Sequence, residues 1–219
     1  ADQVRNPSAW LANAAGKRPQ ATTGVRRQPQ ATTGARAGPQ FLGVSGTTNV
    51  GELASRVKNL IRAGQPCIIK GIGGAPANAA VKAVIMANDF LRQDGMLAAG
   101  RRLAVSLSDA KVPAREGNDE AKKSTALVLR VHALDAPEES GVEFDTFVGQ
   151  TSEPPKVAAF LRDQLEMKDV VTIQASGEQP IFRALQSMRI AERYLAQKDP
   201  TATLAGILYR LEETDEAKG

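Results

Sequence analysis

The sequence predicts an α+β fold in which two tandem β-α-β-α-β-β sandwich repeats follow an extended basic N-terminal arm. Residues 43–91 and 147–195 align at a constant offset of 104 residues without a gap, and their apolar positions coincide. Within each copy, two stretches with helical apolar spacing flank a run rich in β-branched residues. The first 40 residues, by contrast, consist largely of Pro, Gly, Gln, Thr, Ala and Arg.

These patterns divide the chain into five segments. They are a basic arm over residues 1–40, a first repeat over 41–134, an acidic linker over 135–145, a degenerate second repeat over 146–213 and an acidic tail over 214–219.

The first copy opens with a short extended run at residues 41–44, which leads into a helix. Asn49, followed three residues later by Glu52, predicts a capping box at the helix start. This first helix is predicted by apolar residues at i, i+3, i+4 and i+7 spacings: Val50, Leu53, Ala54, Val57, Leu60 and Ile61. A β-rich run over residues 67–70 follows it.

A glycine-rich turn then opens a second helix over residues 76–91. Its small-residue face indicates close packing, and the second copy has a matching face. We therefore expect the two repeats to pack through these helices, either against each other or against equivalent repeats of other chains. The two faces consist of Ala77, Ala80 and Val81 in the first copy and Ala184, Leu185 and Met188 in the second.

Two strands, over residues 103–107 and 126–131, complete the first copy. The connection between them, residues 108–124, predicts a protruding hairpin, and a solvated loop of mixed charge is the alternative. The second copy has an extended run at 146–148, a β-rich run at 170–173 and, after Leu195, room for one strand over 204–211. Because a complete unit needs two strands there, we expect the second repeat to lack the hairpin.

The first copy also resembles a known family. The runs VSGTTNVGELASRVKNLI (44–61) and IIKGIGGAPANAAVKAVIMANDFL (68–91) are similar to the Alba superfamily, in particular to the stage V sporulation protein S type. The positions that match the family's glycine- and alanine-rich run are Ile69, Lys70, Ile72, Gly73, Gly74, Ala75, Asn78, Ala80, Val81, Lys82 and Ala83. Pro76 and Ala77 depart from the family's alternating Gly and Ala.

The resemblance implies three properties. It implies a fold similar to the C-terminal domain of bacterial translation initiation factor three, dimer formation, and binding of DNA or RNA. In Alba proteins the hairpin lies along the minor groove, which would place residues 108–124 against nucleic acid. Two fused copies would form an internal pseudo-dimer, and a homo-oligomer is the alternative.

Charge is distributed unevenly along the chain. Residues 1–40 carry six basic and one acidic residue (net +5), residues 41–133 carry thirteen and seven (net +6), and residues 134–219 carry nine and sixteen (net −7). Such asymmetry predicts an anionic partner for one end of the molecule. In the second copy Lys70 is replaced by Gln174 and Lys82 by Gln186.

The arm contains the repeated segment PQATTG at residues 19–24 and 29–34. This composition is typical of a disordered linker, because it buries too little apolar surface to offset the entropy of ordering. The alternative is an arm that lies on a partner, with Trp10 as its apolar anchor. Its basic contacts would then be Lys17, Arg18, Arg26, Arg27 and Arg36.

We find no catalytic pattern. His132, the single histidine, lies on a predicted strand without a Ser or Cys nucleophile signature, so a structural role is favoured. Gly71, Gly73 and Gly74 favour a tight strand-to-helix turn, with an anion site as the alternative. Cys67 lies in a predicted buried strand, and a single cysteine excludes an internal disulfide framework. No cofactor or metal is expected.

The sequence therefore predicts a non-enzymatic nucleic-acid-binding subunit of a larger assembly, with RNA preferred over DNA. The rival is a scaffold subunit without nucleic-acid binding, in which both repeats dock onto other proteins and the arm is a tether. We also expect a soluble, intracellular protein, because no signal-peptide or membrane-spanning stretch is seen. The expected phosphate contacts are Lys70, Lys82, Arg101, Arg102, Lys111, Arg115, Lys122 and Lys123, with turn donors at Ser45, Thr47, Thr48 and Asn49.

Overall fold

The computed structural model describes residues 9–15, 41–111, 125–136 and 143–210. The helices of this part are α1 (Val50–Arg62), α2 (Gly74–Gln93), α3 (Pro154–Met167) and α4 (Glu178–Lys198). The strands are β1 (Ala9–Ala15), β2 (Phe41–Val44), β3 (Cys67–Gly71), β4 (Arg101–Lys111), β5 (Thr125–Asp135), β6 (Thr146–Val148), β7 (Val170–Ala175) and β8 (Leu204–Arg210).

The described strands form one sheet in the order β2-β3-β5-β4-β8-β1-β7-β6. At its centre β4 pairs antiparallel with β8, through Ala104 opposite Ile207 and Ser106 opposite Ala205. This pairing joins two halves of the sheet. We call β2, β3, β4, β5, α1 and α2 the first half, and β1, β6, β7, β8, α3 and α4 the second half.

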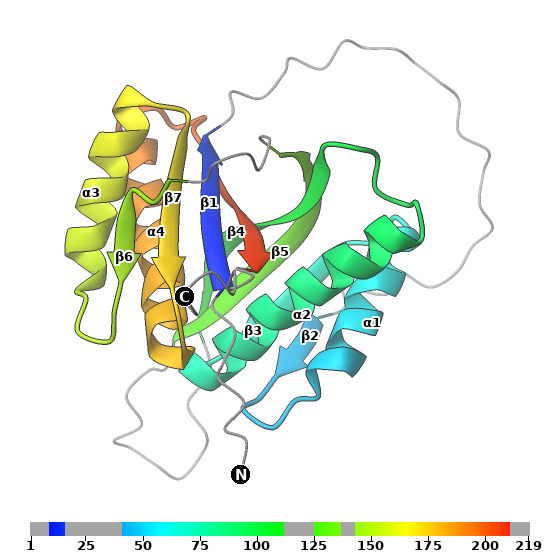
Figure 1. Ribbon diagram of the computed structural model, residues 1–219. Coiled ribbons are helices and arrows are strands. Elements are labelled where there is room, and N and C mark those ends of the chain that lie inside the picture. The colour runs from blue at the N-terminus through cyan, green and yellow to red at the C-terminus, as the bar shows by residue number, and fades with distance from the viewer. Residues whose placement is uncertain (1–8, 16–40, 112–124, 137–142, 211–219) are drawn as a thin grey trace, which may run out of the picture.

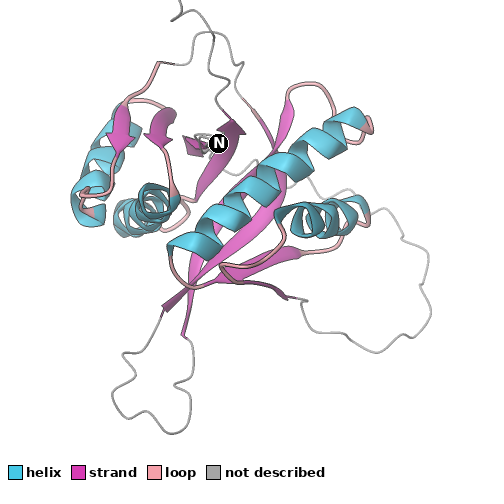
Figure 2. Ribbon diagram, turned by 60° about the horizontal axis from the view of Figure 1, so that its bottom comes forward, coloured by secondary structure: helices cyan, strands magenta, loops and turns pink. Residues whose placement is uncertain are grey.

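The four helices cover one face of this sheet. A single apolar core contains buried residues from all four helices together with alternate strand residues such as Leu103 and Val105 of β4. Figure 2 shows the helices as two pairs, α1 beside α2 and α3 beside α4. In addition α2 contacts α4, as their small-residue faces predicted. The residues of those faces, Ala77, Ala80, Val81, Ala184, Leu185 and Met188, are all buried.

The N-terminal segment corrects the expectation of a separate 40-residue arm. Residues 9–15 form β1, which lies between β7 and β8 and pairs antiparallel with both. Figure 1 shows this strand, from the start of the chain, beside the last strand of the chain. In the first half β5 holds the equivalent place, between β3 and β4. The second half therefore does have the strand that its own sequence lacks after Leu195, and β1 supplies it.

The two long helices, α2 and α4, are each preceded by a glycine in the same backbone conformation, and these glycines are 104 residues apart. Gly73 precedes α2 with φ 91°, and Gly177 precedes α4 with φ 92°. Both have ψ near 180°, a region that only glycine adopts without strain. By contrast, α1 begins at a side-chain cap, because Asn49 Oδ1 accepts hydrogen bonds from the Gly51 and Glu52 amides at 2.9 and 3.2 Å.

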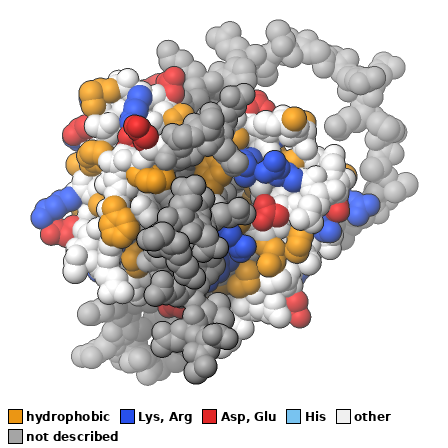
Figure 3. Space-filling model, in the orientation of Figure 1, with side chains coloured by type: hydrophobic (Ala, Val, Ile, Leu, Met, Phe, Trp, Pro, Cys, Tyr) orange, Lys and Arg blue, Asp and Glu red, His pale blue; other side chains and the backbone are white. Residues whose placement is uncertain are grey.

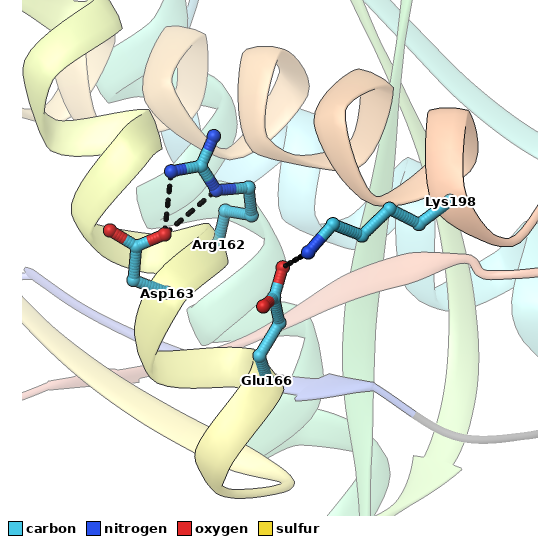
Figure 4. Close-up of polar contacts among 4 residues, drawn as sticks. All are labelled: Arg162, Asp163, Glu166 and Lys198. Atoms are coloured by element: carbon cyan, nitrogen blue, oxygen red, sulfur yellow. Dashed lines mark hydrogen bonds and ion pairs between the residues drawn. The ribbon is translucent and has the colours of Figure 1, made fainter.

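The contacts within each helix pair also recur at this spacing. Lys58 of α1 lies 5.6 Å from the ring centre of Phe90 in α2, and Arg162 of α3 lies 5.7 Å from that of Tyr194 in α4. Figure 4 shows a second link between α3 and α4, in which Lys198 Nζ lies 2.6 Å from Glu166 Oε1. Charged side chains therefore contact the neighbouring helix in both helix pairs.

A side chain from each second helix holds the start of the following strand. Asn88 Oδ1 in α2 accepts a hydrogen bond from the Leu103 amide at 3.0 Å. Glu192 Oε1 in α4 accepts one from the Leu204 amide at 3.3 Å, and burial raises the pKa of this carboxyl. Each contact thus fixes the start of a central strand, β4 or β8, to the helix that precedes it.

The strands β4 and β5 are longer than predicted. They run in register from Arg101 opposite Asp135 to Lys111 opposite Thr125. Lys111 is therefore the last residue of β4 rather than part of the connection, and the predicted hairpin tip, residues 112–124, lies outside the described residues. The helices of the described part include none with an apolar stretch of membrane-spanning length.

Cys67 is expected to be unreactive in the native protein. Only 2% of its surface is exposed, and burial raises the pKa of its thiol to about 12. Since the thiolate is the nucleophile, alkylation by iodoacetamide at pH 8 should be at least about tenfold slower in the native than in the urea-unfolded protein. Mass spectrometry of timed samples measures both rates, and equal rates would contradict the burial of this thiol.

Candidate nucleic-acid interface

The first half has one sheet face that no described helix covers. Side chains alternate between the two faces of a strand. Leu42, Ile69 and Leu129 belong to the core beneath the helices, so Phe41 and Gly43 of β2, Lys70 of β3 and Arg130 of β5 lie on the opposite side. We call this side the helix-free face.

The carboxylates of the first-half strands all lie on one face of the sheet, whereas basic residues lie on both. By strand alternation the charged residues on the helix-free face, among the described residues of β2 to β5, are Lys70, Arg102 and Arg130. All three are basic. The carboxylates of these strands, Asp109 and Asp135, alternate onto the other face. The helix-free face therefore presents positive charge without an acidic residue from its own described strands.

A shallow groove lies where this face meets the outer edge of the sheet. It has a volume of about 670 Å³ and is lined by Phe41, Gly43, Val44, Ser45, Gly46, Thr48, Lys70, Gly71, Ile72 and Pro76. Lys70 is opposite Gly43 in the parallel pairing of β2 and β3. A Cβ at Gly43 would meet no atom within 4 Å, so this glycine leaves open space beside the lysine.

Of the four predicted turn donors Ser45 and Thr48 line the groove, although their hydroxyls already contact one another. Thr48 Oγ1 accepts a hydrogen bond from the Ser45 amide at 2.8 Å. Ser45 Oγ lies 3.1 Å from Thr47 Oγ1 and 3.2 Å from Thr48 Oγ1. Asn49 Oδ1 is occupied as the helix cap. The structure therefore brings Ser45 and Thr48 to Lys70, whereas it gives Asn49 a structural role.

Arg102 lies about 20 Å from Lys70, since their partners on β5, Leu134 and Val128, are six residues apart. Its guanidinium lies 4.7 Å from the ring centre of Tyr209 in the second half. Burial, together with the nearby charge of Arg92, lowers the pKa of this guanidinium. Arg102 thus joins the two halves at the far end of the helix-free face, where it lines a hollow together with Asp89 and Arg92 of α2.

The other residues that the sequence predicts to contact phosphate or a partner do not line the groove. Arg101 donates to the Ala133 carbonyl at 3.0 Å and pairs with Asp135 at 3.4 Å, so its charge is partly compensated. Lys82 belongs to α2 and lies on the helix side of the sheet. Lys111 ends β4, and Trp10 lies in β1 with its backbone opposite Gln174 and Tyr209. Outside the described residues are Lys17, Arg18, Arg26, Arg27, Arg36, Arg115, Lys122 and Lys123.

Two residues of this surface were missed by the sequence analysis. Phe41 is 57% exposed on the edge strand β2, and Arg130 is exposed between the core residues Leu129 and Val131. Strand alternation within the predicted run 126–131 could have identified Arg130. The exposure of Phe41 could not be predicted, because it depends on β2 being the outermost strand.

The second half carries different side chains on the sheet face that its helices leave uncovered. By the same alternation, the described residues of β6, β7 and β8 place no charged side chain there; Thr172 and Gln174 stand where the first half has Ile68 and Lys70. Phe147 on the edge strand β6 is 61% exposed. Figure 3 shows basic and acidic side chains intermixed on the described part of the visible surface. The concentration of positive charge is thus local to the first half.

The described residues contain no group of His, Cys, Asp and Glu suited to hold a metal ion. His132 is half-buried on β5, and burial lowers the pKa of its imidazole while a hydrogen bond to the Arg130 backbone acts in the opposite direction. The structural role that the sequence favours for this histidine stays a prediction.

Comparison with known proteins extends the sequence resemblance. Residues 40–99 match the family model of stage V sporulation protein S (SpoVS). This segment spans β2, α1, β3 and α2, and so includes the groove and the turn beside it. No curated protein matches the chain. The predicted resemblance to the stage V sporulation protein S family is therefore confirmed for residues 40–99.

Proposed function

We propose that this protein binds single-stranded nucleic acid, RNA in preference to DNA, as a non-enzymatic subunit of a larger assembly. The observation that carries the proposal is the distribution of charge in the first half, where Lys70, Arg102 and Arg130 share the helix-free face and the carboxylates of the same strands lie on the other face. A charge arrangement of this kind attracts a polyanion.

The groove supports a single strand rather than a duplex. Phe41 offers an exposed ring on which an unpaired base can stack, and Lys70 lies in the same groove at the distance of a neighbouring strand. Aromatic stacking next to cations that follow the backbone is the usual means of binding single strands without sequence preference. Splayed bases on a sheet surface are also typical of RNA recognition.

We further propose that the second half is a degenerate unit of the same type. In its favour are the shared offset of 104 residues, the equivalent glycines Gly73 and Gly177, and the equivalent strand-holding contacts of Asn88 and Glu192. On this proposal the second unit has lost its basic residues, because Gln174 replaces Lys70. Nucleic acid then meets the first half, and the second half faces protein.

Substitutions in the groove should separate the two kinds of contact. Lys70→Ala and Arg130→Ala should each weaken binding to a single-stranded RNA 20-mer and flatten the plot of log K against log salt by about 0.7, one phosphate contact on a single strand. Phe41→Ala should remove about 1–3 kcal/mol of stacking and leave the salt slope unchanged. Fluorescence anisotropy from 50 to 300 mM salt measures both quantities.

Lys156→Ala is the matched control, because this exposed lysine lies on α3 in the second half and pairs with Glu153 at 2.8 Å. Its affinity and its salt slope should equal those of the wild type. A wild-type protein without salt-sensitive binding to RNA or DNA would refute the proposal. If duplex RNA bound more tightly than the single strand, the stacking role of Phe41 would be wrong.

One observation favours a scaffold function as the second candidate. Phe147 in the edge strand β6 is 61% exposed and Phe144 just before it 43%, and among the described strands β6 pairs with β7 alone. An open strand edge beside exposed aromatic rings can accept a strand from another protein. Docking at β6 would depend little on salt, so the salt titration distinguishes it from nucleic-acid binding in the first half.

A further inference from the structure

A hollow of about 400 Å³ lies where α2, the start of β4 and the end of β8 meet. Each of these three elements contributes one arginine to its lining. Arg92 belongs to the last turn of α2, Arg102 is the second residue of β4, and Arg210 is the last residue of β8. We call these three side chains the arginine cluster. Asp89 is the one carboxylate among the described residues that line the hollow, so three basic residues and one acidic residue give this lining a net charge of +2.

The fold holds the three elements together at this point. The antiparallel pairing of β4 with β8, continued by two residues from Ala104, brings Arg102 level with Tyr209. Beside them, Asn88 Oδ1 accepts the hydrogen bond from the Leu103 amide that fixes β4 to α2. The described lining residues all belong to a helix or a strand, and sites on such elements keep their geometry better than sites on loops.

The Arg102 guanidinium is oriented by an aromatic neighbour. It lies 4.7 Å from the ring centre of Tyr209. A guanidinium that stacks on a ring uses its flat face, and its N–H groups stay in the plane of the group, where they form the paired donors that match two oxygens of a phosphate. Tyr209 thus holds Arg102 in an orientation suited to an oxyanion.

Asp89 does not balance the charge of the cluster. Burial, followed by the charge of Arg92, lowers the pKa of the Arg102 guanidinium, and the opposite effect of Asp89 is smaller than that of Arg92. The guanidinium groups of Arg92 and Arg102 are therefore close enough to repel each other. Placing like charges together in a hollow is costly unless an anion joins them.

A second hollow, where β4 meets α4, shows how this fold satisfies a pair of arginines when it supplies the anion itself. There the Asp109 carboxylate accepts hydrogen bonds from Arg189 and, at 2.7 Å, from Arg193. The arginine cluster, by contrast, brings three guanidinium groups to a described lining with one carboxylate, so it attracts an anion from outside the chain.

The charge of the lining favours one class of anion. A phosphate monoester carries a charge of about −1.5 to −2 at pH 7 and three terminal oxygens, which are enough for three guanidinium groups. A phosphodiester inside a strand carries a single negative charge. A net charge of +2 therefore favours a free or terminal phosphate over the phosphates within a chain.

We propose that the arginine cluster binds a dianionic phosphate group, either as a free ion or as the terminal phosphate of a nucleic-acid strand. Binding of the free ion does not depend on the function proposed above. Binding of the strand end rests on it: Arg102 lies at the far end of the helix-free face, about 20 Å from Lys70, so a strand that follows this face reaches the hollow with its end.

Titration of the full-length protein with inorganic phosphate at pH 7.5 tests the free ion, with sodium chloride keeping the ionic strength constant. Phosphate should raise the melting temperature along a saturable curve, whereas chloride alone should not. Arg92→Gln should raise the phosphate concentration at half-saturation about tenfold, because it removes a charge-assisted hydrogen bond. Arg62→Gln is the matched control, since Arg62 is also an exposed arginine in the last turn of a helix, α1, but does not line the hollow.

Internally labelled RNA 10-mers of one sequence test the strand end, with a phosphate at the 5′ end, at the 3′ end or at neither. Fluorescence anisotropy should show one phosphorylated strand binding about tenfold more tightly than the strand with two hydroxyl ends. This preference should persist in Arg62→Gln and disappear in Arg92→Gln.

Asp89→Asn should act in the opposite direction. Loss of this carboxylate removes a charge that repels the anion, so the phosphate concentration at half-saturation should fall at least about threefold. If Asp89 served only to hold the arginines in place, the variant would lose stability with or without phosphate. Weaker phosphate binding in Asp89→Asn would count against the proposal.

Three results would overturn the proposal. They are the lack of both a saturable phosphate effect and a preference for a phosphorylated strand end, a phosphate effect that is equal in the wild type and in Arg92→Gln, and equal losses in Arg92→Gln and Arg62→Gln. If RNA binding failed altogether while inorganic phosphate still bound at the cluster, the proposed function alone would be refuted and the free ion would remain as the ligand.

Discussion

Removal of residues 1–15 is expected to abolish the cooperative unfolding of the second half. These residues contain β1, whose backbone pairs with residues 170–175 of β7 on one side and 204–210 of β8 on the other. Without β1 both strands lose their ladder partners on the facing edges, although Val171, Ile173 and Leu208 are core residues. Buried backbone groups without partners are costly, and two newly open edges promote aggregation.

Circular dichroism during heating measures this effect. We expect the truncated protein to lose part of its helical signal at 25 °C and to unfold over a broad range, and limited proteolysis should cut within α3 and α4. Deletion of residues 1–8 is the control, because it leaves β1 intact. A synthetic peptide of residues 7–17, added in excess, should restore the cooperative transition by filling the vacated place. A truncated protein that unfolds like the wild type would show that β1 is dispensable.

A single substitution within β1 refines this test. Ala12→Pro removes one backbone donor from a strand that is flanked on both sides, at a cost of about 3 kcal/mol or more. Ala12→Gly keeps the donor and should cost about 0.5–1 kcal/mol. Urea denaturation compares the two variants, and equal losses would argue against a backbone role for Ala12.

Gly74→Val is expected to push the two halves apart. A Cβ at Gly74 would lie 3.2 Å from the Glu178 carbonyl oxygen and 3.0 Å from Gln179 Nε2, so the start of α2 touches the start of α4. The backbone of α4 cannot move aside as a flexible side chain can. Valine at this position should therefore cost about 3 kcal/mol of unfolding free energy through overpacking.

Chemical denaturation measures the loss, and Gly43→Val is the matched control because a Cβ there meets no atom within 4 Å. Gly73→Ala isolates a different cause, since a Cβ at Gly73 also meets no atom within 4 Å but its φ of 91° strains any other residue. It should cost about 1–3 kcal/mol. If Gly74→Val were no worse than Gly43→Val, the close approach of α2 and α4 would be refuted.

Local patterns predicted most elements and part of the candidate interface. The apolar spacing and the Asn49 cap located α1, and alternation located β4 and β5 to within a few residues at each end. Lys70, Ser45 and Thr48 were identified from their neighbours in sequence and do meet in one groove. The sequence did not show that Arg101 pairs with the Asp135 carboxylate or that Asn49 Oδ1 accepts from an amide of α1, and their assignment to the interface stays a prediction.

By itself the sequence determined the kinds of element, their order and the offset of 104 residues, because helical periodicity, capping and strand alternation arise from residues close together in the chain. Tertiary structure alone decided that β1 fills the second half, that the helix-free face of the first half holds basic residues but no carboxylate of its own described strands, and that Asp109 meets Arg189 and Arg193. Each of these depends on which strand edges remain vacant once distant segments pair. That choice is made by non-local contacts, which no short stretch of the chain encodes.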